Sequence, residues 1–579
     1  MKKYLWIVYI LIFIAIFACK KDEKKNWLWL ALLEQSTSEV ATVEIQGQIT
    51  DTSGNPYSEA SLSVAKEATT SIQSRGATVT GTTKTDTKGN FTLYLNIGKY
   101  KISVYKSDGT LIGSFVLQPQ NLTNKHISEA DVSGLLITLT EAVAIGSNVN
   151  LLSANFSFSA FTNLIGVSGA TIYQNAVATD SVGNIYTTGA STVSLDGNTV
   201  TGTSDVTIHK YDKKGIRKWT KLLGVASLMS YGYGITTDSL GNVYVTGFTD
   251  TGGGLDGNPT IGAQDGFVAK YNSSGSKKWV KAIGVASAYT TANDVAIDSS
   301  GNIYVVGYTT GNLDGNTAAG TKDLFVMKYD TNGNRKWTKL LGVSGQDTSG
   351  NDIAIDSSDN LYVTGATKGN LDGNTKTGTQ DMFVSKYDSS GNRQWTKLLG
   401  GSGADTSGSG ITINSSDSAI YISGTTSVSL DGQTFNGGGT QYSDAFVAKY
   451  DSSGNRDTTF TKQVGVNGTI TQGQEITVDS SENVYIIGNT KGSLLGNTLT
   501  GVQDIFVIKY NSSGTYKGIK LMGITGSGSS YGLGITLDSY GTPVAVGWIQ
   551  ATATVGGSFD NIPALGTNAN GFITTKLKP

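Results

Sequence analysis

One unit of roughly 60 residues recurs seven times between Thr162 and the C-terminus, and this repetition constrains the fold more than any other feature of the chain. Each unit holds four short runs rich in Val, Ile, Tyr, Phe, Trp and Thr, bounded by Gly, Asn, Asp and Ser, which is typical of strands joined by tight turns. A lysine in the third run counts the units: Lys210, Lys270, Lys328, Lys386, Lys449, Lys509 and Lys576. A fixed period of this length indicates a solenoid or a propeller. Four strands in each of seven units predict an all-β fold, a seven-bladed β-propeller of four-stranded blades.

The composition agrees with many short hairpins in a large ordered chain. Of 579 residues, 38% are hydrophobic and 15% are charged, which is too apolar a balance for a disordered chain. The 75 glycines and 6 prolines indicate turns built by Gly, Asn and Asp. The net charge of −2 offers no concentrated basic surface, so nucleic acid is not expected as a partner.

Residues 1–19 predict a lipoprotein signal peptide. Lys2 and Lys3 precede an apolar run, Leu5 to Phe17, that is too short to span a bilayer comfortably. The stretch IFAC that ends at Cys19 resembles a bacterial lipobox, which implies lipidation of Cys19 and a membrane anchor; an uncleaved anchor with a free thiol is the alternative. Residues 20–40 then form a tether. Because Cys19 is the only cysteine, no internal disulfide is expected.

Residues 41–140 lack the repeat and predict a small β-sandwich before the propeller. Alternating apolar residues such as Phe91, Leu93 and Leu95, with regular turn clusters, are typical of antiparallel strands. The pattern GxxxDxxGxP, TDxxGxF, GxYxxxV resembles the carboxypeptidase regulatory-like, transthyretin-like module, and it is carried by Gly47, Asp51, Gly54, Pro56, Asp86, Gly89, Phe91, Gly98 and Tyr100. The resemblance implies a spacer or binding accessory without catalytic residues. Residues 141–153 are expected to be its linker.

The repeats of residues 154–579 resemble the SBBP family of bacterial β-propeller repeats, which implies a propeller and no particular activity. Within a unit, the small aliphatic run DIAID suits the innermost strand, IYVVG the second, FVxKY the third and the tryptophan-bearing WTKLLG the outermost. The first run of the ring, Phe161 to Gly166, matches the outermost strand, and the last, Phe572 to Lys576, matches the third. The N-terminal strand is therefore expected to complete the last blade and close the ring, which removes free sheet edges.

This strand order gives the ring two unlike faces. The tight DSSGN and YDSSGNR turns lie on one face. Long polar loops, such as Thr309–Asp323 and Gly342–Asn351, lie on the other. Binding is expected on the loop face, because function concentrates in loops held by a rigid scaffold.

Side chains that recur in every unit favour structural roles. One aspartate series falls at the first turn, with an asparagine in the fifth unit: Asp180, Asp238, Asp298, Asp356, Asn414 and Asp479. Another opens the third strand: Asp205, Asp265, Asp323, Asp381, Asp444 and Asp504. The LDGN loops, with Asp196, Asp256, Asp314, Asp372, Asp431 and Asp560, have the oxygen atoms that suit calcium, but one carboxylate per loop favours a loop-ordering turn. No metal or cofactor site is expected.

Departures from sevenfold symmetry are more informative about binding. At one aligned position the units carry Tyr173, Tyr231, Thr291, Ser349, Ser407, Gln472 and Tyr531. Its tyrosines fall in the first, second and seventh blades, which are contiguous in a closed ring. Placed in the loops that lead into the innermost strands, Tyr173, Tyr231, Tyr233 and Tyr531 are predicted to form one exposed aromatic patch for a protein or glycan. The alternative is that they tuck inward and seal the channel.

The sequence favours a binding protein over an enzyme. The chain has two histidines, His126 and His209, and no metal triad, nucleophile elbow or phosphate-binding glycine loop stands out. The leading hypothesis is a non-catalytic surface lipoprotein, held on the outer membrane by lipidated Cys19, whose loop face binds a protein or glycan. A scaffold for envelope assembly on the periplasmic side is the alternative, and a propeller hydrolase is a weaker one.

Overall fold

A computed structural model describes residues 161–577 apart from 168, 253, 539–540, 552–557, 565–567 and 576, together with eight strands between residues 42 and 157. The chain forms two compact units, Met1–Ser159 and Ala160–Pro579. In the parts so described, no helix is long and apolar enough to cross a membrane. The expected signal peptide, Cys19, the tether and His126 lie outside the described residues.

The first unit contains two antiparallel sheets. Its strands are β1 (Thr42–Asp51), β2 (Ser61–Lys66), β3 (Thr83–Lys84), β4 (Asn90–Asn96), β5 (Tyr100–Tyr105), β6 (Leu111–Pro119), β7 (Ile137–Ala144) and β8 (Ser147–Ser157). One sheet has the order β4-β1-β8 and the other β3-β2-β5-β6-β7. The segment 141–153, expected as a linker, is strand instead: β7 pairs with β6 and β8 with β1. Its alternating Val149 and Leu151 are the strand signal that the linker assignment missed.

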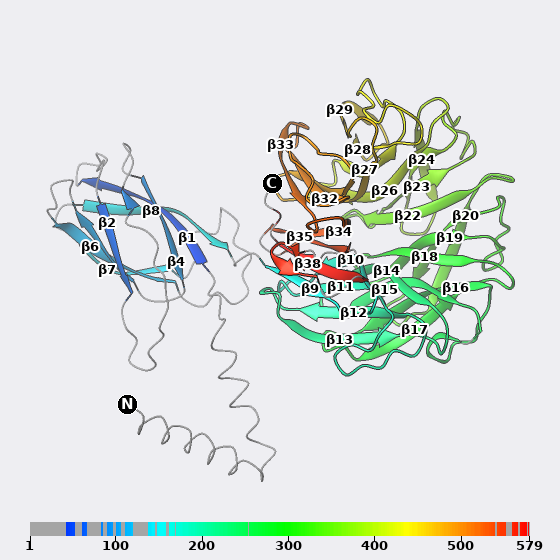
Figure 1. Cartoon of the computed structure of the whole chain (residues 1–579), viewed down its shortest axis with the longest axis horizontal. Coiled ribbons are helices and arrows are strands. Elements are labelled where there is room, and N and C mark those ends of the chain that lie inside the picture. Colours follow the sequence, from blue (N-terminus) through cyan, green and yellow to red (C-terminus); the bar gives the residue numbers. More distant parts are fainter. Residues whose placement is uncertain are drawn as a thin grey trace, which may run out of the picture. The chain divides into compact units, whose positions relative to one another are not determined.

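The second unit is a ring of seven blades (Figure 1). The first blade holds β10 (Ile172–Thr179), β11 (Ile185–Ser191), β12 (Asp205–Tyr211) and β13 (Arg217–Leu223); the second β14 (Ser230–Thr237), β15 (Val243–Asp250), β16 (Gln264–Tyr271) and β17 (Lys277–Ile283), with a short 3-10 turn, η2 (Leu255–Gly257). The third holds β18 (Thr290–Ile297), β19 (Ile303–Thr309), β20 (Asp323–Tyr329) and β21 (Arg335–Leu341); the fourth β22 (Thr348–Ile355), β23 (Leu361–Thr367), β24 (Asp381–Tyr387) and β25 (Arg393–Leu399).

The remaining blades repeat the pattern. The fifth holds β26 (Thr406–Ile413), β27 (Ile420–Thr426), β28 (Asp444–Tyr450) and β29 (Arg456–Val464), and the sixth β30 (Thr471–Val478), β31 (Val484–Thr490), β32 (Asp504–Tyr510) and β33 (Tyr516–Met522). The seventh holds β34 (Ser529–Leu537), β35 (Pro543–Gln550), β38 (Ala569–Thr574) and β9 (Thr162–Ile165), with a small hairpin of β36 (Ser558–Phe559) and β37 (Ile562–Pro563).

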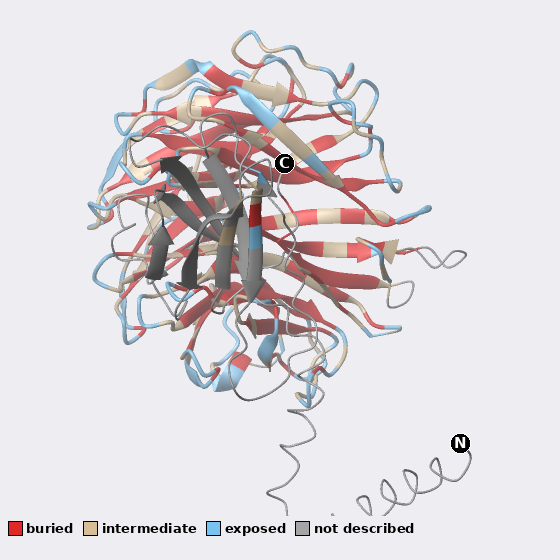
Figure 2. Cartoon of the chain, turned by 90° about the vertical axis from the view of Figure 1, so that its left-hand side faces the viewer, coloured by how far each residue is buried: buried red, intermediate tan, exposed pale blue. Residues whose placement is uncertain are grey.

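The predicted seven-bladed fold of four-stranded antiparallel blades is confirmed. In every blade the four strands pair in the order given, and the first strands of neighbouring blades contact one another around the whole ring, from β10 through β34 and back to β10. The second and third strands are almost completely buried, while the outermost strands and the loops carry the exposed residues (Figure 2). The hydrophobic core therefore lies between neighbouring blades and continues around the whole ring.

The two ends of the ring meet in the seventh blade. Strand β9 pairs antiparallel with β38, so that Ile165 lies opposite Gly571 and Thr162 opposite Thr574. Phe161, just before β9, packs against Gly215 in the first blade. Strand β9 therefore fills the outermost position that the chain leaves empty after β38.

Candidate binding site at the mouth of the central channel

Each innermost strand contains a β-bulge, and these bulges build the channel wall. The pairing register shifts after the third or fourth residue of the innermost strand in all seven blades, for example between Gly350 and Asp352, so that Asn351 has no partner in the second strand. A bulge redirects neighbouring side chains. Two consecutive residues per blade can therefore face the axis.

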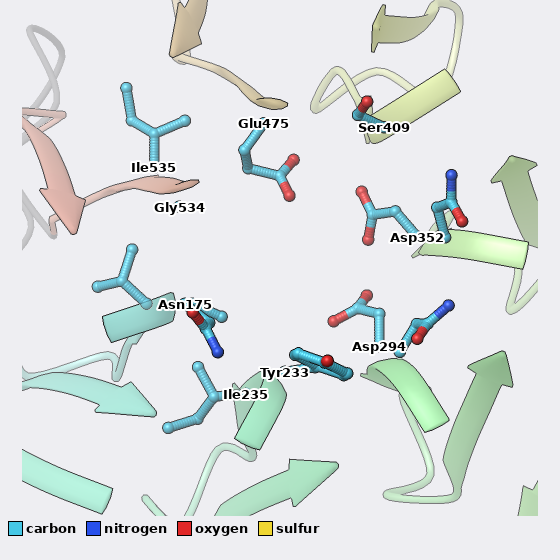
Figure 3. Close-up of a pocket in the computed structure, with 13 residues that line it drawn as sticks. Asn175, Tyr233, Ile235, Asp294, Asp352, Ser409, Glu475, Gly534 and Ile535 are labelled. Carbon is cyan, nitrogen blue, oxygen red and sulfur yellow. The ribbon is translucent and has the colours of Figure 1, made fainter. Parts of the chain in front are cut away.

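We call these positions the first and second channel rings. The first ring consists of Asn175, Tyr233, Asn293, Asn351, Ser409, Gln474 and Leu533, and the second of Ala176, Gly234, Asp294, Asp352, Gly410, Glu475 and Gly534. Members of both rings line a cavity of about 140 Å³ (Figure 3). The first ring also lines a wider hollow of about 540 Å³, bounded by Phe248 and Tyr308, at the channel mouth.

Three carboxyl groups from different blades meet in the narrower cavity. Figure 3 shows Asp294, Asp352 and Glu475 directed toward one another across the axis. Asp352 is only 8% exposed, and hydrogen bonds join it to both Asp294 and Glu475. Backbone amides hold it in place, since Ile411 N–H donates to its Oδ2 at 2.6 Å and Ile353 N–H to its Oδ1 at 2.8 Å. We refer to these three groups as the channel carboxyls.

Enclosure and mutual repulsion make the channel carboxyls weak acids. Burial, followed by the neighbouring Asp352, raises the pKa of Asp294 well above its ordinary value. Burial also raises the pKa of Asp352, although the surrounding hydrogen bonds oppose it, and burial together with Asp352 raises the pKa of Glu475. Carboxyls that share hydrogen bonds must share protons.

Glycines in the second ring make room for these side chains. A Cβ on Gly234 would lie 2.6 Å from Asp294 Oδ1, and a Cβ on Gly410 would overlap with Glu475 Oε1. Larger side chains at both positions would collide with the carboxyls. The channel carboxyls therefore depend on the glycines at neighbouring positions of the second ring for their space.

An aromatic arc borders the mouth above these groups. The chain of ring contacts runs from Tyr531 stacked on Trp548, at 3.8 Å between centroids, to Tyr173 at 5.2 Å from Trp548. It continues from Tyr173 to Tyr231 and then to Phe248, and Tyr308 of the third blade lies beside it at the cavity edge. We define the aromatic arc as Tyr531, Trp548, Tyr173, Tyr231, Phe248 and Tyr308, all of which are half-buried.

Strand register explains why the arc covers only part of the ring. The tyrosine position of the innermost strand lies opposite one residue of the second strand, as Tyr231 lies opposite Phe248. In the fourth to sixth blades, the pairs are Ser349 with Ala366, Ser407 with Thr425 and Gln472 with Asn489. The channel mouth is therefore aromatic over the seventh, first, second and third blades and polar over the fourth to sixth blades.

The structure brings together the four tyrosines singled out from the sequence, with one correction. Tyr173, Tyr231 and Tyr531 lie within the innermost strands rather than in the loops before them, because those strands begin earlier than the DIAID run indicated. Tyr233 lies one step deeper, in the first channel ring, 5.6 Å from the Phe248 ring. Burial, followed by Tyr308 and Tyr231, raises the pKa of Tyr233 to about 12.

The recurring aspartates occupy structural positions. Asp180 accepts hydrogen bonds from the backbone of Val182 and Asn184 and from the Tyr186 hydroxyl. Asp205 likewise accepts from the backbone N–H groups of Thr201 and Gly202. In the LDGN series, Asp196 adopts a left-handed backbone with φ of 49° and bonds Arg217 and Thr220 of the outermost strand.

His209 is buried between the third and fourth strands of the first blade, where its Nδ1 lies 2.9 Å from Thr220 Oγ1. Burial, followed by Arg217, lowers its pKa to about 3. The ring therefore stays neutral at physiological pH.

Sequence reasoning missed the channel carboxyls. The DIAID pattern predicts Asp294 and Asp352 only as ordinary residues of the innermost strand. The signal was present: the same position holds Ala or Gly in four other units and Glu475 in the sixth. The tyrosines are singled out by the same signal, a position whose residue differs between the seven units.

Comparison with known proteins supports the repeat. A family model described as "Beta-propeller repeat", SBBP, matches residues 160–196, 218–253, 278–314, 336–372, 394–431 and 459–496. Each matched segment runs from an outermost strand to the second strand of the next blade, as 160–196 runs from β9 to β11. The sequence repeat is therefore offset from the structural blade.

The curated relatives are distant and much longer. An uncharacterised WD repeat-containing protein of Acanthamoeba polyphaga mimivirus is 28% identical over 417 residues, covering 48% of this chain and 25% of its own length. The regulatory protein FlaEY of Caulobacter vibrioides is 26% identical over 208 residues, covering 32% of this chain and 21% of its own length. The chain thus spans about a quarter of the relatives that it matches.

Solved structures share the architecture only remotely. A gluconolactonase of Xanthomonas campestris is 13% identical with a TM-score of 0.29, covering 62% of this chain and 91% of its own. An α-L-arabinofuranosidase of Fusarium graminearum is 10% identical with a TM-score of 0.35, covering 63% and 97%. Identities and TM-scores this low give no reason to assign the activity of either enzyme to this chain. The seven blades and the six matched segments together show that this chain is a β-propeller repeat protein, with SBBP repeats matched between residues 160 and 496.

Proposed function

We propose that this chain is a membrane-anchored, non-catalytic surface lipoprotein whose propeller binds a protein or glycan at the channel mouth. The aromatic arc is the observation that supports this proposal best. It places six half-buried aromatic rings on four contiguous blades, on the face that carries the long loops. Aromatic side chains combine large contact area with few rotatable bonds and are enriched in binding surfaces.

Neighbouring loops extend this surface. Met229, Ile261 and Tyr289, in loops of the second and third blades, are 42%, 41% and 55% exposed. Exposed apolar side chains gathered beside an aromatic surface are typical of an interaction site. The polar fourth to sixth blades would then form the rim of the contact.

Binding can be tested with a variant of the four tyrosines. The Tyr173, Tyr231, Tyr233, Tyr531→Ala variant is expected to lose at least about tenfold in affinity for its partner, because aromatic residues commonly dominate binding energy. The measurement passes both proteins over host-matrix proteins, glycans and solubilised envelope proteins. Tyr516→Ala is the matched control, since this 44% exposed tyrosine lies on an outermost strand.

Each result of the panel has a distinct meaning. Loss of a host-protein or glycan signal in the folded variant would support the surface receptor. Binding confined to envelope proteins would favour the envelope scaffold instead. Undiminished binding by the tyrosine variant would refute the arc as the site.

The proposed anchor has its own test. Cys19→Ala is expected to abolish incorporation of labelled fatty acid and to release the protein from the membrane fraction. Digestion of intact cells with an external protease then distinguishes a surface location from a periplasmic one. An unlabelled wild-type protein would refute lipidation.

A further inference from the structure

We infer that the 140 Å³ cavity below the aromatic arc receives a lysine side chain of a partner protein, whose ammonium group is held by the channel carboxyls. This inference rests on the proposed function, because it specifies the chemistry of the group that enters the same mouth. Four observations carry it: the acceptor-rich wall of the cavity, an unpaired hydroxyl close to Asp294, the size of the cavity and the charge that its carboxyls can adopt.

The polar wall offers hydrogen-bond acceptors. Asn175, Asn293 and Asn351 each donate through Nδ2 to a glycine carbonyl of the next blade, at 2.7 to 2.8 Å. Each bond uses one of the two amide N–H donors, and the Oδ1 atoms have no hydrogen-bond partner among the described residues. No lysine, arginine or histidine is among the described residues that line the cavity or its mouth. An ammonium group, which has three donors and no acceptor, complements such a wall.

A buried hydroxyl beside Asp294 independently indicates a missing polar partner. Thr246 is completely buried, and its Oγ1 has no hydrogen-bond partner among the residues that the structure describes. The equivalent threonines donate within their own blades, Thr188 to Thr207 O and Thr364 to Phe383 O. Thr246 Oγ1 instead lies 2.6 Å from the Cβ position of Gly234, as does Asp294 Oδ1. Both oxygens thus lie next to Gly234 of the second ring, and Asp294 is the one of the two residues that also lines the cavity.

The size of the cavity favours a lysine over a sugar. A cavity of about 150 Å³ accommodates benzene, so 140 Å³ holds an unbranched alkylammonium chain but not a sugar ring with its hydroxyl groups. The apolar side chains Val177, Ile235 and Ile535 also line this cavity and can contact the methylene groups. Phe248 and Tyr308 border the entrance, and the Phe248 ring face can attract a passing cation.

The charge of the cavity can adjust to an ammonium group. Burial raises the pKa of all three channel carboxyls, and a cation placed between them would favour their ionised forms. The titratable groups that face the channel carboxyls are Tyr233 of β14 and Tyr308 of β19, and Lys322 lies over the Tyr308 ring at 4.2 Å. Strands β10, β26 and β34 contribute no titratable side chain to the rings. Entry of a cation would therefore displace a shared proton into solvent.

The test uses n-butylammonium as the lysine side-chain surrogate and titrates it calorimetrically into the full chain. The Asp352→Asn, Glu475→Gln double variant is expected to weaken binding at least about tenfold, because it removes buried charge partners of the ammonium group. Amides replace the carboxyls with similar shape, and a thermal melt of the variant verifies its fold. Asp405→Asn, an exposed carboxyl on the same face, is the matched control and is expected to bind like the wild type.

Two further readouts separate the proposal from its rivals. Titration in buffers of different ionisation enthalpy is expected to show proton release with the wild type and less with the double variant. Equal binding of 1-pentanol would overturn the role of charge, and binding of glucosamine without n-butylammonium would overturn the lysine.

The partner panel distinguishes this inference from the proposed function. Capture that depends on the four tyrosines but not on Asp352 and Glu475 would overturn the lysine site and leave the binding face intact. Equal affinity of n-butylammonium for the wild type and the double variant would also overturn the inference. Capture that is lost in both variants would support it.

Discussion

At the scale of single residues, the propeller separates side chains that repeat from side chains that do not. Asp298 repeats: its Oδ2 accepts from Asn302 and Tyr304, and Asn414 occupies the same turn in the fifth blade. Asp294 has an acidic counterpart in only two other blades, Asp352 and Glu475, and it lies on β18, four residues before Asp298. The repeating acid orders a turn, whereas the other faces the channel. Functional residues of a blade are therefore found by comparing each position with the equivalent position in the other blades.

The channel carboxyls predict an unusual dependence of stability on pH. Their pKa values are raised in the folded state, so the folded chain binds more protons than the unfolded chain above the unfolded value of about 4. Stability from these groups is present at low pH and is lost as pH rises through the raised pKa values. The melting temperature of Asp294→Asn should consequently fall less than that of the wild type between about pH 5 and pH 8.

Thermal melts at both pH values measure this difference. Asp405→Asn, whose carboxyl is exposed, should follow the wild-type profile. An Asp294→Asn variant that loses as much stability as the wild type over this range would contradict shared protons in the channel.

At the scale of elements, the turn between the third and fourth strands of the first six blades packs against the blade before it. The Trp337 indole packs on Gly391 of the next blade, and Lys328 Nζ donates to Ser389 O there at 3.1 Å while lying 4.7 Å from the Tyr304 ring centre. Phe460 takes the indole position in the fifth blade, against Gly514. An aromatic ring over a glycine turn is thus the repeated contact between outer strands.

This contact predicts a graded response to substitution. Trp337→Ala should lower the free energy of unfolding by about 2–4 kcal/mol, because it removes a large side chain from between two blades. Trp337→Phe should cost less than about 1.5 kcal/mol, since the fifth blade uses phenylalanine in that place. Chemical denaturation of the two variants compares them directly, and equal costs would argue against the ring-on-glycine contact.

At the scale of the whole molecule, one short strand holds the ring closed. Ile165 of β9 is 2% exposed and belongs to the apolar cluster between the seventh and first blades. Ile165→Asp should lower the free energy of unfolding by at least about 3 kcal/mol, because it buries an unpaired carboxylate. Val167→Asp, two residues later and 46% exposed, should change it by no more than about 0.5 kcal/mol.

Denaturation of both variants tests the closure. A similar stability of the two would mean that the ring does not depend on β9. A large loss confined to Ile165→Asp would show that the join of the two chain ends stabilises all seven blades.

Much of this architecture could be predicted from the sequence, because it repeats. The blade count, the strand order and the role of Asp180 in its turn all follow from positions that agree across units. The bulge at Asn351 could not be predicted, because Gly350 and Asn351 are typical of turns and extend the expected loop Gly342–Asn351 up to the DIAID run. Without knowledge of the bulge, Asp352 is predicted to be an ordinary strand residue. The three carboxyls come from different blades, so no short stretch of sequence indicates that they meet.

The offset between the sequence repeat and the blade has a consequence for how such chains can change in length. Every repeat begins with the last strand of one blade and supplies the first strands of the next, as residues 160–196 do for the seventh and first blades. Duplication or loss of a whole repeat would leave two chain ends that still fit each other. Gain or loss of whole repeats can therefore change the number of blades while the same pairing of N-terminal and C-terminal strands closes the ring. Each such change would alter the width of the channel and the side chains that line it.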